Sequence, residues 1–288
     1  MARHLEYRID SRFDGKKIKE FLKNEVGVSH RMLCILKREP LGITVNGAHA
    51  RTVDFLHAGD TLCLAFPDDE HNSVSAPTNI PLEILYEDDD IIVINKPAGL
   101  AMHETHNHQG DALSNALAFY LEQKGNPAVF RAVGRLDKGT SGLVVCARNK
   151  YAAYRLAGQV QKTYFAVACG VFEGSGTIDA PIYRPDAGKT LRAVGENGER
   201  AVTHWEALKC DGKCTLLKIR LETGRTHQIR VHFAHLGAPL VGDDMYGSPD
   251  LRLNHQALHC GECRLVHPVT SEEMVFCAPL PCDMQALL

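Results

Sequence analysis

The segment with the clearest potential for chemistry is Arg131 to Leu143, which reads R-A-V-G-R-L-D-K-G-T-S-G-L. It sets one carboxylate, Asp137, among basic and small residues, and an apolar, strand-like run begins at Leu143. Its glycines permit tight turns and close backbone approach, so we expect Asp137 on a bent, exposed segment anchored by a buried strand. Neighbouring cations keep a carboxylate ionised, and the ionised form attacks electrophiles. Taken alone, the same residues also describe an ordinary loop aspartate that caps a turn.

The sequence G-R-L-D-K-G-T-S-G-L around Asp137 resembles the active-site motif of the RluA-type pseudouridine synthases, in which Arg-Leu-Asp followed by Thr-Ser-Gly carries the catalytic aspartate. Further segments match this family in the expected order, which is more specific than one isolated motif. They are a Lys-Pro loop at residues 95–99, a Lys-x-Tyr strand at 162–164, an arginine-containing block at 223–232, and Q-A-L-H at 256–259 with His267-Pro268. Gly134 departs from the pattern, since many members carry histidine there. We expect it to alter packing or local RNA contact and to leave Asp137 intact.

The resemblance implies an enzyme that isomerises uridine to pseudouridine in structured RNA without a cofactor, with ribosomal RNA favoured and transfer RNA as the other substrate. It implies three catalytic residues, Asp137, Tyr164 and Arg225. We expect Arg225 to form a bidentate pair with Asp137, and Tyr164 to stack on the target base or to assist proton removal. Attack by Asp137 at ribose C1′, addition at uracil C6 and a route through a glycal all stay open.

The same side chains have simpler interpretations when each is taken alone. A strand tyrosine such as Tyr164 more often packs in a core, and an exposed Arg225 salt bridge would contribute about 0 to 1 kcal/mol. Lys162 and Tyr164 share one face of a strand that could border the Asp137 loop. Arg135 could be an ordinary phosphate contact. The resemblance instead has Arg135 fill the space that the target base leaves when it is flipped out of its stack, at a cost of a few kcal/mol.

Length and composition are compatible with this class of enzyme. The chain has 288 residues, 44% of them hydrophobic, which suits one large domain or two smaller ones. A signal-like N-terminus and a long apolar run are both missing, so we predict a cytoplasmic protein without a membrane span. No P-loop or G-x-G-x-x-G sequence indicates a nucleotide cofactor. We expect a monomer, because no extended heptad pattern is present.

Metal chemistry is the main alternative in the sequence. Cys260 and Cys263 form a C-x-x-C pair in a chain of ten scattered cysteines, which we otherwise expect to be reduced thiols. Possible further ligands lie nearby, namely His255, His259, His267, Cys277 and Cys282. No second C-x-x-C follows, and no carboxylate joins His227, His232 and His235 in a zinc signature, so we predict no metal. A zinc-dependent nucleobase deaminase would also need a Pro-Cys-x-x-Cys arrangement that is not completed here.

The distribution of charge favours a nucleic-acid partner more than the net charge of −3 does. Residues 16–38 carry seven basic and two acidic side chains, and residues 131–162 carry seven basic side chains against Asp137 alone. Acidic residues cluster at 68–70 and 87–90. We therefore expect a basic face and an acidic back.

The N-terminal region has the features of a small separate domain. Ile18, Phe21, Leu22 and Val26 have helical spacing, Ser29 can cap a second helix, and Asn46-Gly47 marks a hairpin. This order resembles the S4-like RNA-binding domain of many family members, so we predict such a domain at residues 1–66 and a polar linker at 67–81. Its predicted RNA-contacting residues are Lys16, Lys17, Arg31, Lys37 and Arg38. The alternatives are a solvated basic surface and a non-catalytic RNA-binding module, which would not need Asp137, Tyr164 and Arg225 together.

Residues 82–288 are predicted to form the catalytic domain. Strand-like runs occur at 91–94, 143–146, 164–169, 203–208 and 216–221, with a helix capped by Asp111 and a helix-like run that opens at Arg225. Several strands with few helices between them indicate an α+β fold with a mainly antiparallel sheet and flanking helices. The resemblance implies the same architecture, the pseudouridine synthase fold.

Overall fold

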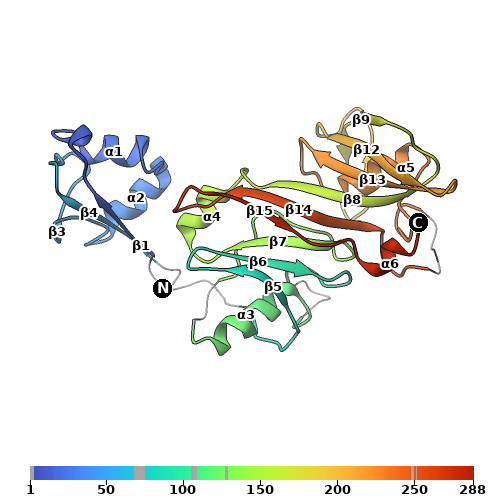
Figure 1. The fold of residues 1–288 in the computed structure, drawn as a ribbon, viewed down its shortest axis with the longest axis horizontal. Helices are drawn as coiled ribbons and strands as arrows, with labels where there is room; N and C mark the ends of the chain where they lie inside the picture. The colour runs from blue at the N-terminus through green and yellow to red at the C-terminus, as the bar shows by residue number, and fades with distance from the viewer. Residues whose placement is uncertain (1–2, 68–74, 105–108, 127–128, 248–249, 251) are drawn as a thin grey trace.

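The computed structural model describes residues 3–67, 75–104, 109–126, 129–247, 250 and 252–288. Its N-terminal unit, residues 3–66, is a four-stranded antiparallel sheet in the order β1-β4-β2-β3 beside two short helices (Figure 1). The elements are β1 (Arg3–Arg8), a 3₁₀ turn (Ser11–Phe13), α1 (Ile18–Asn24), α2 (His30–Arg38), β2 (Ile43–Val45), β3 (Ala48–His49) and β4 (Thr61–Phe66).

Local sequence explains the N-terminal unit well. Alternate residues of β4 are buried, as expected for a strand with one face on a core. The Ser29 hydroxyl accepts a hydrogen bond from the Met32 amide at 3.2 Å, which confirms the predicted cap of α2. Asn46 and Gly47 both have positive φ, 53° and 81°, so the tight turn between β2 and β3 is also confirmed.

The rest of the chain is built on one nine-stranded sheet in the order β5-β6-β7-β14-β8-β13-β12-β9, with β15 paired to β14. All of its pairings are antiparallel except β7 with β14. The predicted α+β class with a mainly antiparallel sheet is therefore confirmed. The strands are β5 (Glu83–Glu87), β6 (Ile91–Lys96), β7 (Ser141–Ala147), β8 (Gln161–Cys169), β9 (Ser175–Asp179), β12 (Val202–Cys210), β13 (Cys214–Leu221), β14 (Leu258–Val266) and β15 (Glu273–Cys277).

Helices cover this sheet and one small hairpin extends from it. They are α3 (Leu113–Gln123), α4 (Lys150–Leu156), α5 (Gln228–His235) and α6 (Cys282–Gln285), and the hairpin is β10 (Ile182–Tyr183) with β11 (Ala193–Val194). The predicted Asp111 cap of α3 is wrong. Ala112 is the N-cap residue, and the side chain of Asn115 accepts the Ala112 amide at 3.1 Å. The run expected to open at Arg225 becomes helical only at Gln228.

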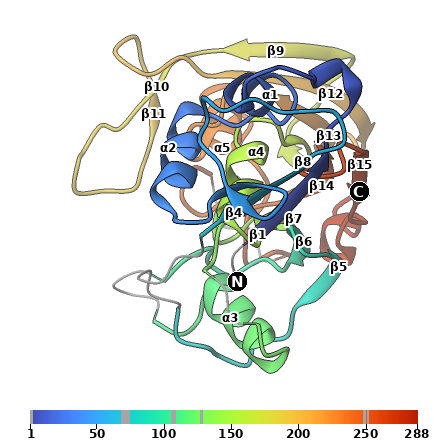
Figure 2. The same cartoon turned by 90° about the vertical axis from the view of Figure 1, so that its left-hand side faces the viewer.

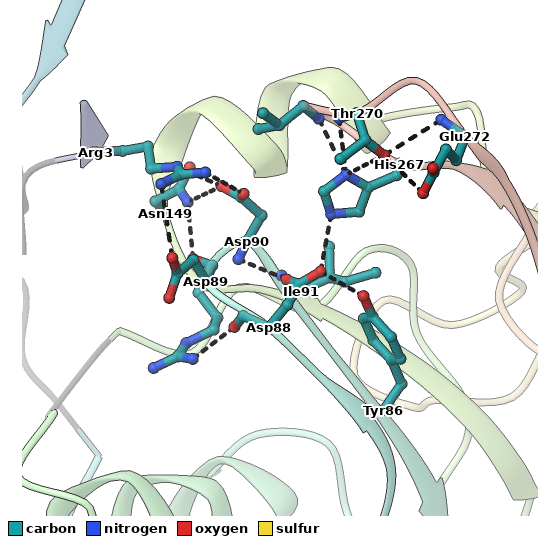
Figure 3. Close-up of polar contacts among 12 residues, drawn as sticks. Arg3, Tyr86, Asp88, Asp89, Asp90, Ile91, Asn149, His267, Thr270 and Glu272 are labelled. Carbon is teal, nitrogen blue, oxygen red and sulfur yellow. Dashed lines mark hydrogen bonds and ion pairs between the residues drawn. The ribbon is translucent and has the colours of Figure 1, made fainter. Parts of the chain in front are cut away.

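The N-terminal unit is attached to the large sheet through β1 and α4 (Figures 1 and 2). Arg3 forms a bidentate ion pair with Asp90 at 2.9 and 2.6 Å, and Asn149 donates to the same carboxylate at 2.8 Å (Figure 3). Tyr151 of α4 is buried in the hydrophobic core of the N-terminal unit, where its ring lies 5.0 Å from that of Phe66. The contact thus combines a shared core with a charged network.

None of the helices in the described part of the chain has both the length and the apolarity to span a membrane.

Candidate active site

Asp137 lies on the loop that leads into β7, and two glycines let this loop pack against the neighbouring chain. A Cβ atom at Gly142, where φ is +106°, would lie 2.2 Å from the carbonyl oxygen of Cys260 on β14. A Cβ atom at Gly139 would lie 2.2 Å from the side-chain oxygen of Gln256. A larger residue at position 142 would push the loop away from β14, and one at position 139 would displace the Gln256 side chain. The glycines of the G-T-S-G sequence are thus explained by close approach.

Hydrogen bonds then fix the same loop. The side chain of Gln256 donates to the Thr140 hydroxyl at 3.0 Å, and the Ser141 hydroxyl lies 2.9 Å from Nδ1 of His259. The Asp137 carbonyl accepts the Thr140 amide at 3.0 Å, which closes a tight turn. The Q-A-L-H segment therefore holds the loop from the β14 side.

Lys96, at the end of β6, holds the loop from the other side. Its ammonium is fully buried and donates to the carbonyl oxygens of Pro97, Leu100 and Lys138 at 2.8, 2.9 and 3.1 Å. Burial lowers the pKa of Lys96 to about 7, and the charge of Asp137 opposes this shift. Three carbonyl acceptors engage all three protons of the charged amine. Lys96 thereby ties the Lys-Pro loop to the residue that follows Asp137.

A cavity of about 310 Å³ opens beside Asp137, a volume near the lower end for small-ligand pockets. Seven ionisable side chains line it, namely those of Arg135, Asp137, Lys162, Tyr164, Arg225, His227 and Arg230. Lys162 and Tyr164 both reach the cavity from β8, as their spacing predicts. Burial, with smaller contributions from Cys260 and Asp137, raises the pKa of Tyr164 well above 10, so its phenol is neutral at physiological pH.

Arg230, in the first turn of α5, is the arginine that pairs with Asp137. One guanidinium nitrogen lies 3.3 Å from Oδ2 of Asp137, and two others donate to the buried carboxylate of Asp243 at 2.7 Å each. Burial acts to lower the pKa of Arg230, but hydrogen bonds and the charges of Asp243 and Asp137 raise it. Asp243 therefore sets the plane of the guanidinium, and Arg230 presents one edge to Asp137.

The expected ion pair between Arg225 and Asp137 is wrong. Arg225 lies at the cavity edge, where it pairs with Glu199 and donates to the Arg200 carbonyl at 3.1 Å. It precedes the helix, whereas Arg230 lies within α5 and is almost fully buried. The sequence block T-G-R-T-H-Q-I-R contains both arginines, and no local signal in it distinguishes the exposed Arg225 from the buried Arg230.

His227 is a further site residue that the sequence analysis considered only as a metal ligand. It is the N-cap residue of α5, and its Nε2 atom lies 3.9 Å from Oδ2 of Asp137. Burial lowers its pKa, Asp137 opposes that shift, and the charges of Arg230 and Arg192 reinforce it. His227 is therefore an uncharged imidazole beside the carboxylate at neutral pH.

Among the described residues, some histidine and carboxylate side chains lie close enough together to hold a metal ion. One group, Asp88, Asp90 and His267, brings its ligand atoms within 4.8 Å of one another. Protein donors already occupy these carboxylates: Asp88 accepts from Tyr86 and His267, and Asp90 accepts from Arg3 and Asn149 (Figure 3). This group therefore serves the contact between the N-terminal unit and the large sheet.

The two cysteines of the C-x-x-C pair have the surroundings of structural thiols. Cys260 and Cys263 are buried in the hydrophobic core of the large sheet. Burial raises the pKa of Cys260 to about 11 and that of Cys263 to about 12. Both side chains therefore stay protonated and act as small apolar residues.

The basic residues predicted in the N-terminal unit are all exposed, and the structure does not place them in the Asp137 cavity. The Lys17 ammonium lies 5.9 Å from the centre of the Phe55 ring. Arg31 lines a separate cleft of about 420 Å³, together with Lys150 and Tyr154 of α4. The exposed set is Lys16, Lys17, Arg31, Lys37 and Arg38.

The family follows from comparison with known proteins. A family profile described as RNA pseudouridylate synthase matches residues 90–235, a segment that contains Lys96, Asp137, Tyr164 and Arg230. This chain belongs to the RNA pseudouridylate synthase family. The predicted family and enzyme class, an isomerase that acts on RNA, are confirmed.

Relatives of this pseudouridine synthase match it over most of their length. The uncharacterized RNA pseudouridine synthase YjbO of Bacillus subtilis is 36% identical over 277 residues, covering 94% of this chain and 98% of the relative. Ribosomal large subunit pseudouridine synthase D of Haemophilus influenzae is 43% identical, covering 73% and 71%. The solved structure of Human RNA Pseudouridylate Synthase Domain Containing 1 has a TM-score of 0.57 at 28% identity, covering 73% and 86%.

Proposed function

We propose that this pseudouridine synthase isomerises specific uridines in structured RNA, with Asp137 as nucleophile and without a cofactor. The observation that carries the proposal is the setting of Asp137. Its side chain is 17% exposed at a cavity that Tyr164 also lines, and Arg230 lies 3.3 Å away. Ribosomal RNA is the favoured substrate, because relatives from several bacteria are named ribosomal large subunit pseudouridine synthase D. Transfer RNA is the second candidate.

The chemistry of the reaction needs no co-reactant. The bond between uracil N1 and ribose C1′ breaks, and a bond between C5 and C1′ forms. C5 then loses its proton and N1 gains one, so substrate and product contain the same atoms and the same number of electrons. An ionised Asp137 can serve as nucleophile at C1′ or at C6, or as base on a glycal route.

Neighbouring side chains have roles that fit their geometry. A neutral, buried Tyr164 offers a flat face on which the uracil ring can stack. Arg230, oriented by Asp243, holds one carboxylate oxygen of Asp137. Arg135 enters the gap that a flipped uridine leaves, a role supported by its exposed side chain at the cavity. Lys162 and Arg225 at the cavity provide cations for the flanking phosphates.

The proposal includes the organisation of the whole chain. Residues 1–66 act as an S4-like RNA-binding domain, 67–81 as a linker and 82–288 as the catalytic domain. The exposed basic residues of the first domain bind the RNA backbone outside the cavity, and most of this contact is electrostatic. We propose that the enzyme works as a monomer in the cytoplasm.

Site-resolved mapping of pseudouridine in total RNA tests the proposal. Cells that lack this gene should lose one or a few pseudouridines, which wild type restores and Asp137→Asn does not. With purified protein, Asp137→Asn should lower the rate by at least about 10⁴-fold, the order seen when a nucleophile is removed. Its affinity for the RNA should change little. Substantial turnover by homogeneous Asp137→Asn protein would remove Asp137 from the nucleophile role.

A further inference from the structure

His227 has an unusual backbone conformation for a residue with a side chain. Its φ is +58°, in the left-handed region, immediately before the first residue of α5. Such a conformation is strained for a residue with a side chain and persists only where the surroundings impose it. In this conformation the imidazole lies at the cavity, with its side chain 11% exposed and Nε2 3.9 Å from Oδ2 of Asp137.

Tyr246 contacts Nδ1, the ring nitrogen of His227 that does not face Asp137. The Tyr246 hydroxyl oxygen accepts the backbone amide of Arg192 at 2.9 Å and lies 2.8 Å from Nδ1 of His227. With an acceptor position taken by that amide, the single phenol proton is available to Nδ1. The other ring nitrogen faces a carboxylate, which only accepts hydrogen bonds. When Nδ1 accepts and Nε2 carries the hydrogen, the Tyr246 hydrogen bond forms and an N–H group points toward the carboxylate of Asp137.

We propose that His227 is a positioning residue for Asp137, held by Tyr246 as its neutral Nε2–H tautomer. The inference rests on the function proposed above for Asp137. At 3.9 Å the contact is longer than a hydrogen bond, so the N–H group restrains Asp137 once the carboxylate shifts toward bound substrate. When the bond between Asp137 and the substrate breaks, the Nε2–H group of His227 stabilises the released carboxylate oxygen without transferring a proton to it.

The charges around His227 explain why the neutral form suits this task. Burial lowers the pKa of His227 most, Arg230 and Arg192 lower it further, and Asp137 and Asp243 oppose this shift. A protonated His227 would present a second N–H to the Tyr246 hydroxyl and would offer a removable proton to Asp137. Arg230 supplies positive charge without that proton, because a guanidinium does not deprotonate in proteins. Arg230 thus supplies the positive charge beside Asp137, and His227 supplies a neutral N–H donor that restrains its position.

The tautomer can be measured on the free protein without any RNA. Long-range ¹H–¹⁵N correlation spectra of the histidines distinguish the Nε2–H tautomer, the Nδ1–H tautomer and the charged form. The His227 signals are assigned by their loss in His227→Gln. We expect the Nε2–H tautomer at neutral pH in wild type and a change of tautomer in Tyr246→Phe. A charged or Nδ1–H His227 in wild type would overturn the inference. This outcome does not depend on the RNA substrate, so it is distinct from a failure of the proposed function.

The difference in kcat between two variants of His227 provides a second readout, because a purely structural role would not distinguish them by the position of their N–H group. His227→Gln keeps an uncharged N–H at the Nε2 position, whereas His227→Asn suits the backbone conformation but reaches only the Nδ1 position. We expect kcat to fall by up to about 100-fold in the Asn variant and by less than about 3-fold in the Gln variant, with KM unchanged in both. Equal loss in both variants would contradict the proposal.

The pH dependence separates this role from packing. His227 loses its function when it takes up a proton, so wild-type kcat should fall as the pH drops through the pKa of His227. The Gln variant should lack this acid limb. In Tyr246→Phe the limb should move to higher pH, because the hydroxyl that donates to Nδ1 is gone. Tyr120→Phe, which removes a phenol bonded to Glu87 at 2.7 Å far from α5, is the control. An identical acid limb in wild type and His227→Gln would refute the inference.

Discussion

Removing either partner of the ion pair between Arg230 and Asp243 should destabilise the protein strongly. The two side chains are 6% and 0% exposed and share two hydrogen bonds of 2.7 Å. Loss of one partner from a buried pair leaves an uncompensated charge, which costs about 3–5 kcal/mol. We expect about 3 kcal/mol for Asp243→Asn, because Arg230 keeps Asp137 as a partner. Arg230→Met leaves Asp243 with backbone donors at 3.2 Å and belongs at the upper end of that range.

The free energy of unfolding in urea gives both values and their coupling. The double variant Asp243→Asn with Arg230→Met removes both charges, so its cost should be smaller than the sum of the single costs by about 2 kcal/mol or more. Arg200→Met is the matched control. The bond between Arg200 and Glu222 has a similar length, 3.0 Å, but its side chains are 63% and 45% exposed, so its loss should cost far less than the loss of either buried partner.

The same variants test how Arg230 acts on Asp137. Asp243→Asn releases the guanidinium plane, so the single bond of 3.3 Å to Asp137 is no longer directed. We expect pseudouridine formation to fall by about 100-fold, the effect of a misplacement near 1 Å, while RNA affinity stays near the wild-type value. Additive stability losses in the cycle, or a fully active Asp243→Asn enzyme, would refute the view that Asp243 orients Arg230.

Two further predictions concern the loop and the N-terminal unit. Gly142→Ala should lower the free energy of unfolding by about 2–5 kcal/mol, because it adds backbone strain at positive φ and overpacking against Cys260. The control Gly237→Ala, which has open space around it, should lower it by only about 1–2 kcal/mol. Equal costs in the two variants would exclude the close approach of Gly142 to Cys260. The double variant Lys16→Ala with Lys17→Ala should weaken RNA binding and reduce the slope of log K against log salt by roughly one to two. The control pair Lys209→Ala with Lys213→Ala, at the turn between β12 and β13, should leave the binding and the slope unchanged. An unchanged slope in the first pair would place the RNA contact elsewhere.

Much of the fold could be predicted because its signals are local. The apolar runs at Ile91 and Leu143 became buried strands, and the Asn-Gly hairpin and the Ser29 cap formed as expected. Each of these features depends on a few adjacent residues whose preferences agree with their final environment. The order of motifs along the chain likewise identified the Asp137 loop, since the motifs around it carry their own turn and strand residues.

The errors arose where a distant residue decides the outcome. Arg225 and Arg230 are five positions apart in one motif, and the choice between them depends on Asp243 and Glu199, which the local sequence does not reveal. Aspartate is a frequent cap residue, which favoured Asp111 as the cap of α3, yet Ala112 is the N-cap residue and its amide donates to Asn115 inside the helix. His227 was missed because its contact with Asp137 requires a left-handed residue, which sequence alone does not predict for histidine.

Tyr151 has a consequence for how this protein unfolds and how it could be divided. The residue belongs to α4 in sequence, but its ring is 1% exposed inside the core of the N-terminal unit. A truncated chain that starts after residue 81 would expose this ring, and it would leave Asp90 without Arg3. The N-terminal unit and the part of the chain built on the large sheet therefore stabilise each other. Melting of the N-terminal unit should loosen α4 at the same time, as one cooperative event rather than two independent ones.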